Sequence, residues 1–67
     1  MSTFSDANQV RLALKMKLSM YAWYSSSTVI TVDDGFGVVV GVKRMDNGIR
    51  KLVPPVIDGV SVKAEVE

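Results

Sequence analysis

The sequence predicts a single α+β domain, in which an N-terminal helix packs on a small, mostly antiparallel sheet of three or four strands. Three observations lead to this prediction. The first 24 residues are rich in helix formers and contain no glycine or proline, whereas the later segments are rich in valine and other β-branched residues. Turn dipeptides at Asp34-Gly35, Asn47-Gly48 and Asp58-Gly59 separate these later segments. The 67 residues suffice for one domain, spanning residues 1–67.

The predicted helix covers residues 6–24 and ends at a serine triplet. Its start has two candidate caps, either Ser5 alone or a capping box formed by Thr3 and Asp6. At about 100° per residue, the apolar side chains of this helix fall on two stripes that lie roughly opposite each other. A helix that covers one face of a sheet needs only one such stripe. The first stripe contains Ala7, Val10, Leu14, Leu18 and Tyr21, and the second contains Leu12, Met16, Met20 and Trp23.

The second stripe is the predicted interface. If the first stripe packs on the sheet, the second needs a partner, because each large apolar side chain gains about 1.5–3 kcal/mol on full burial. The sum is an upper bound, yet half of it rivals the whole stability of a small domain. We therefore expect a homodimer or higher homo-oligomer that buries Leu12, Met16, Met20 and Trp23. The alternatives are that the chain wraps its own helix or leaves part of the stripe exposed.

Three strands are predicted from β-branched residues and from alternation of apolar and polar side chains. They cover residues 27–33, 36–44 and 60–66. A fourth segment, residues 49–53, does not alternate cleanly. It is either a further strand, joined to the preceding one at Asn47-Gly48, or a loop or single helical turn.

Both faces of the predicted first hairpin are apolar, so one is expected to take the helix while the other is available to a second protomer. A two-residue turn at Asp34-Gly35 determines which side chains share a face. One face carries Val29, Thr31, Phe36, Val38, Val40 and Val42, and the other carries Ile30, Val32, Gly37, Val39 and Gly41.

Four cations form a candidate anion-binding site: Lys43, Arg44, Arg50 and Lys51. If residues 49–53 are a strand, a hairpin at Asn47-Gly48 gathers all four at one end of the sheet. Such a cluster is able to hold a phosphate backbone or an acidic partner. The favoured interpretation is a solvated sheet edge on which lysine blocks aggregation, so nucleic acid is not the expected partner.

Composition argues against most catalytic and metal chemistry. The chain has no cysteine and no histidine, which removes disulfides, the common zinc sites and the usual nucleophile–base pairs. We therefore expect no enzymatic activity, no cofactor and no metal. The net charge is +1, so no global field attracts nucleic acid or a membrane. No apolar run is long enough to span a bilayer and no signal peptide is recognisable, so a cytoplasmic location is the default expectation.

The leading functional hypothesis is a small, non-enzymatic binding or regulatory module that acts through self-association. It depends on the two-striped helix and the two-sided hairpin. One alternative is binding of nucleic acid or an acidic partner through the four cations. The other is an accessory subunit whose apolar faces are buried on a different protein of a larger complex.

Overall fold

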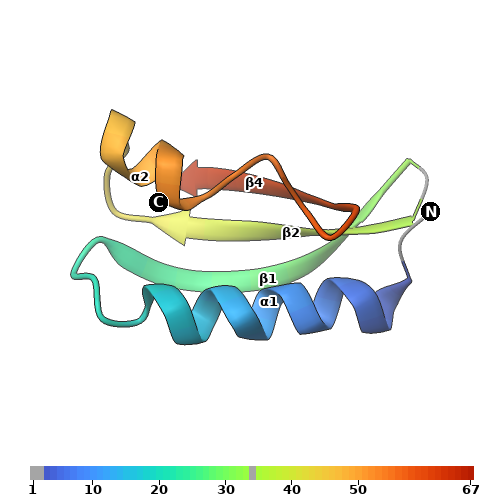
Figure 1. Cartoon of the computed structure of the whole chain (residues 1–67). Helices are drawn as coiled ribbons and strands as arrows, with labels where there is room; N and C mark the ends of the chain where they lie inside the picture. The colour runs from blue at the N-terminus through green and yellow to red at the C-terminus, as the bar shows by residue number, and fades with distance from the viewer. Residues whose placement is uncertain (1–2, 34) are drawn as a thin grey trace.

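The computed structural model describes residues 3–33 and 35–67 and places helix α1 along a four-stranded sheet (Figure 1). This arrangement confirms the predicted α+β fold with an N-terminal helix on a mostly antiparallel sheet. The elements in chain order are α1 (Phe4–Leu18), β1 (Tyr24–Val32), β2 (Gly35–Val42), α2 (Asn47–Leu52), β3 (Val56–Ile57) and β4 (Val60–Val66).

The sheet has the strand order β1-β2-β4-β3 and is mixed. β1 pairs with β2, and β3 with β4, in the antiparallel sense, whereas β2 and β4 are parallel. Parallel neighbours need a crossover connection rather than a tight turn. The segment that contains α2 and β3 provides this crossover, and β4 then lies in the middle of the sheet beside β2.

Helix α1 begins with the capping box that the sequence allows. The Thr3 hydroxyl accepts a hydrogen bond from the Asp6 N–H at 3.2 Å, and the Asp6 carboxylate accepts one from the Thr3 N–H at 3.3 Å. Thr3, not Ser5, is therefore the N-cap. The carboxylate of Asp6 also lies in the first turn, where it interacts favourably with the helix dipole.

The helix ends at Leu18, six residues before the predicted end at residue 24. Two turns follow, with hydrogen bonds from Tyr21 N–H to the Leu18 carbonyl and from Tyr24 N–H to the Tyr21 carbonyl. A continued helix would place Trp23 on the side opposite Leu14, away from the sheet. Because the chain turns instead, the Trp23 side chain reaches the core, where its burial is worth several kcal/mol.

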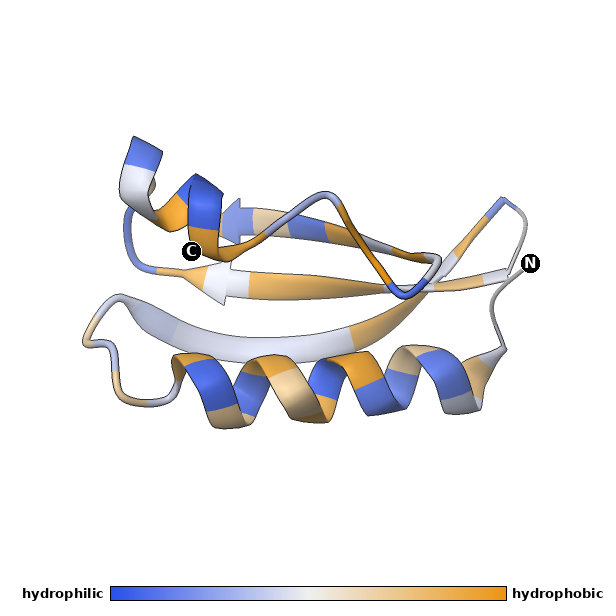
Figure 2. Ribbon diagram, in the orientation of Figure 1, coloured by the Kyte–Doolittle hydropathy of each residue, from blue (hydrophilic) through white to orange (hydrophobic). Residues whose placement is uncertain are grey.

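The core lies between the inner stripe of α1 and one face of the sheet. Figure 2 shows the apolar middle of β2 above a helix on which apolar and polar segments alternate. The first predicted stripe is confirmed at four positions, whereas Tyr21 follows the helix and is half-buried. The buried residues from the helix and from the central strands are Ala7, Val10, Leu14, Leu18, Val38, Val40, Val42, Val60 and Val62.

The hairpin faces are confirmed, although the turn is placed differently. Val29 pairs with Val38, whereas a turn at Asp34-Gly35 would pair Val29 with Val40. The register differs by two residues, and an even shift leaves every side chain on its predicted face. The last residue pair of the ladder is Val32 with Gly35. Asp34 itself lies outside the described residues.

Residues 49–53 are not a strand. They belong to α2 and its C-cap, which confirms the helical-turn alternative. Asp46 caps this helix by accepting a hydrogen bond from the Ile49 N–H at 2.9 Å, and the Ile49 side chain is buried. The fourth strand is instead β3, which pairs with β4 through the turn at Asp58-Gly59.

Candidate interaction surface

The outer side of α1 and the turn that follows it carry three exposed apolar side chains, which we call the methionine ridge: Leu12, Met16 and Met20. Leu12 is 43% exposed, Met16 is 79% exposed and Met20 is 78% exposed. Leu12 and Met16 are one helical turn apart, and Met20 follows in the turn after the helix. The inner stripe already packs on the sheet, so these side chains remain outside the core.

Trp23 was the fourth predicted interface residue, and its predicted place on the outer stripe is wrong. Its side chain is only 9% exposed and belongs to the core of its own chain. It stacks on Tyr21 with ring centroids 5.0 Å apart and planes 19° apart. The Trp23 carbonyl also accepts a hydrogen bond from the Lys43 N–H at 2.8 Å, which ties the turn to the end of β2.

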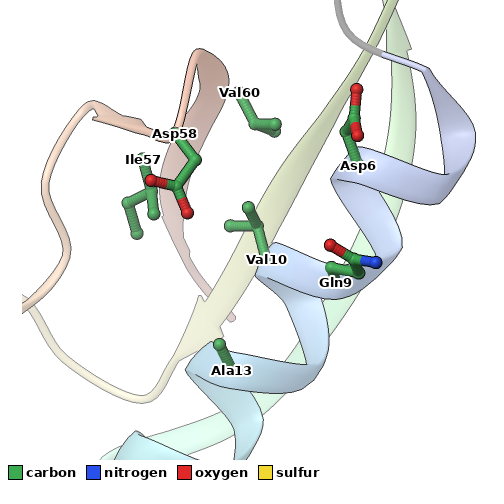
Figure 3. A pocket seen from close by; sticks show the side chains of 7 residues that line it. All are labelled: Asp6, Gln9, Val10, Ala13, Ile57, Asp58 and Val60. Carbon is green, nitrogen blue, oxygen red and sulfur yellow. The ribbon is translucent and has the colours of Figure 1, made fainter.

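A groove separates α1 from the segment that contains β3 and the start of β4. Figure 3 shows side chains from the helix facing side chains from this segment across a cavity of about 300 Å³. A second cavity of similar size adjoins it, because Val10, Ala13 and Ile57 line both. The groove is apolar along its middle, with Asp6 and Asp58 at one cavity and Lys17 at the other.

The four cations of the candidate anion site do not gather as a hairpin would require. Because α2 replaces the predicted strand, Lys43 and Arg44 have no strand partner there. These two line a depression beside Trp23, whereas Arg50 lines a different depression with Lys63. Arg44 also lies 3.9 Å from the Asp46 carboxylate in an exposed ion pair. The predicted arrangement is therefore wrong, and anion binding by Lys43, Arg44, Arg50 and Lys51 stays a prediction.

Two other cations, Arg11 and Lys15, flank the start of β1. They line a depression of about 230 Å³, which we call the basic depression, together with residues 24–27. The Ser27 hydroxyl donates to the Arg11 carbonyl at 3.4 Å and lies 3.1 Å from the Tyr24 hydroxyl. The Arg11 Nε donates to the Asn8 side-chain carbonyl at 2.9 Å. Neither Arg11 nor Lys15 forms an ion pair with a carboxylate of the described residues.

Sequence reasoning found the ridge but missed the groove and the basic depression. Arg11 and Lys15 are four residues apart, so the sequence alone predicts that both lie on one side of the helix. Their position beside the serines of β1 depends on how the helix lies across the sheet. The groove likewise depends on the position of α1, which contacts β1 and β2 more than β4 and so leaves space beside the start of β4.

In residues 3–33 and 35–67, no three potential metal ligands are grouped closely enough to hold an ion. Neither helix of this described part has the length and apolarity needed to cross a bilayer. Comparisons of the chain with models of protein families, with curated proteins and with solved structures found no match.

Proposed function

We propose that this chain is a protein-interaction module that forms a homodimer through the methionine ridge. The observation that carries the proposal is the exposure of Leu12, Met16 and Met20 in one row, on a helix whose other side is already buried. Contiguous exposed apolar side chains on a soluble domain are typical of interaction sites. Methionine is common at such surfaces because its flexible, polarisable side chain adapts to a partner.

The charges along α1 favour a second copy in an antiparallel orientation. Asp6 lies in the first turn of the helix and Lys17 in the last, and both border the groove. Two antiparallel helices related by a two-fold axis place Asp6 of each copy towards Lys17 of the other. A parallel arrangement offers Asp6 no opposite charge of the other copy at the same level along the helix. The antiparallel dimer therefore matches opposite charges on both sides of its apolar centre.

The apolar surface of α1 continues from the ridge towards the groove. Ala13 lines both cavities of the groove and lies three residues from Met16, which puts the two side chains on neighbouring parts of the helix surface. The pairing of Asp6 with Lys17 puts the two-fold axis near Leu12, and a dimer that also covers Met16 therefore extends over the rim of the groove. Three ridge side chains make a small interface, so we expect a dissociation constant in the micromolar range.

Light scattering coupled to size-exclusion chromatography tests the dimer between about 1 µM and 1 mM. We expect the molar mass to rise with concentration from 7.3 kDa towards twice that value. Met16→Lys places a charge within the apolar interface, one helical turn from Leu12, and is expected to give a monomer at every concentration. Because Met16 is exposed, its replacement should change the stability of the monomer by less than about 0.5 kcal/mol.

Val56→Lys is the matched control, because Val56 is 57% exposed and lies on β3, away from the ridge. It makes the same kind of apolar-to-charged change and should leave dimerisation intact. Lys17→Glu should weaken the dimer by removing the charge match with Asp6. A chain that stays monomeric at the highest concentration contradicts the proposal. So does a Val56→Lys variant that dissociates as fully as Met16→Lys.

A further inference from the structure

The two edges of the sheet differ in how well they are protected from pairing with another chain. β3 forms one edge, has two residues and directly follows Pro54 and Pro55. Short strands and prolines are common protections of a sheet edge. β1 forms the other edge, has nine residues and contains neither a charged residue nor a proline. Its long stretch of neutral hydropathy is visible in Figure 2.

β1 also differs from β2 and β4 in burial. Within Tyr24–Val32, all of which the structure describes, no residue is buried, whereas five of the eight residues of β2 are buried. Among the described residues β1 pairs with β2 alone, so its outer N–H and C=O groups face away from the sheet. A β-bulge at Ser25 interrupts the ladder, which leaves Ser26–Val32 as the regular part of the edge.

Positive charge borders this edge on the side of α1. Arg11 and Lys15 line the basic depression together with the first residues of β1, and neither is neutralised by a carboxylate of the described residues. The serines nearby already bind one carboxylate, because Ser25 and Ser26 donate to Glu67 at 2.6 and 3.2 Å. These two hydroxyls are therefore already used, and the start of the edge offers the cations Arg11 and Lys15 to a carboxylate-bearing strand.

We infer that the edge of β1 binds an extended acidic peptide segment, which adds a fifth strand to the sheet beside β1. The main chain of the peptide pairs with the outer groups of Ser26–Val32, as in other cases of strand addition. Its glutamate or aspartate side chains on the α1 side face Arg11 and Lys15. This surface is separate from the methionine ridge, so the domain has two interaction sites.

A β1 strand of a second copy offers these cations no carboxylate within the strand, because Tyr24–Val32 contains no charged residue. Antiparallel pairing about a two-fold axis perpendicular to the sheet keeps both α1 helices on one face. Arg11 and Lys15 of the two copies would then lie at opposite ends of the new strand pair, because antiparallel pairing sets the start of one β1 against the end of the other. An acidic peptide meets these cations with the opposite charge, which is why we assign the edge to such a partner.

Fluorescence anisotropy with a labelled seven-residue peptide that alternates valine and glutamate tests the inference. The wild-type chain is expected to bind this peptide more tightly than the matching peptide of valine and lysine, with an affinity that falls as salt is added. Protein concentrations below the dimer range keep self-association out of the measurement. Amide hydrogen exchange should show new protection within Ser26–Val32 when the acidic peptide is bound.

Arg11→Glu combined with Lys15→Glu should weaken binding by about tenfold or more, because two attractions become repulsions. Lys17→Glu is the matched control, since it makes the same charge change on the same helix but faces the groove. It should alter peptide affinity by less than about twofold. Circular dichroism of each variant verifies that α1 is still folded.

Methylation of peptide amides tests strand addition without any change to the domain. An added strand uses every second N–H for pairing, so one alternate set of methylations should abolish binding and the other should leave it intact. The inference is overturned if both sets bind equally, or if Lys17→Glu weakens binding as much as the double variant. It is also overturned if an oligothymidylate binds through Arg11 and Lys15 and the amides of β1 gain no protection from hydrogen exchange. That result would assign the site to nucleic acid.

Discussion

Replacing Trp23 by alanine distinguishes a core tryptophan from an interface tryptophan. The side chain is 9% exposed and stacks on Tyr21 at 5.0 Å. A tryptophan side chain of about 200 Å² that is buried to this degree removes about 180 Å² from water, which is worth about 4.5 kcal/mol at 25 cal/mol per Å². Residual burial in the unfolded chain and the retained Cβ reduce this to about 3–4 kcal/mol.

Urea unfolding followed by far-ultraviolet circular dichroism measures this loss, because the signal does not depend on the tryptophan. The protein concentration should be low enough that the chain is monomeric, because dimerisation would add to the measured stability. A domain of this size has a total stability of only about 3–10 kcal/mol, so Trp23→Ala is expected to be largely unfolded. Trp23→Phe retains an aromatic ring and should lose about 1–2 kcal/mol while remaining folded.

Met20→Ala is the matched control for Trp23, since Met20 lies three residues earlier and is 78% exposed. It should cost the monomer less than about 0.5 kcal/mol. The assignment of Trp23 to the core is refuted if Trp23→Ala unfolds at the same urea concentration as the wild type. It is also refuted if Trp23→Ala loses stability only at concentrations at which the wild-type chain is dimeric.

Substitutions at Gly37, Asp46 and Asp58 test three local features of the fold. A Cβ at Gly37 would lie 2.9 Å from a backbone oxygen of β4, so Gly37→Ala should lower the free energy of unfolding, measured in urea, by about 1–3 kcal/mol. At Gly41 an added Cβ meets the movable side-chain carboxylate of Glu67, so Gly41→Ala should lower it by less. Asp46→Ala removes the N-cap of α2 and should cost about 1 kcal/mol, with faster hydrogen exchange confined to that helix. Asp58 has a φ of 50°, so Asp58→Ala should lower the melting temperature and Asp58→Gly should not.

The local pattern of the sequence was sufficient to predict several elements. The inner stripe of α1 and the capping box at Thr3 were predicted from spacing alone, because both depend on residues three or four positions apart. Strand β4 was predicted from its alternation, and the structure extends it over the expected residues. The hairpin faces were correct even though the turn was misplaced, since side chains on a strand repeat every two residues.

The end of α1 and the nature of residues 49–53 were not decided locally. Residues 19–24 contain no glycine or proline, so propensity alone continues the helix. The turn after Leu18 is favoured by the burial of Trp23, which depends on a core that the sheet provides. In the same way, α2 is favoured by the burial of Ile49 and by its cap at Asp46, whereas the dipeptide Asn47-Gly48 had indicated a hairpin.

The sequence by itself therefore determined that one side of α1 packs on a sheet and that Leu12, Met16 and Met20 are left outside it. Helical periodicity fixes this division for Leu12 and Met16, because it depends only on the angle between successive side chains, whereas Met20 lies in the turn after the helix. Only the tertiary structure decided that Trp23 belongs to the core and that Arg11 and Lys15 border an unprotected strand edge. Those outcomes depend on strand order and on where the helix crosses the sheet, which are set by contacts between residues distant in the chain.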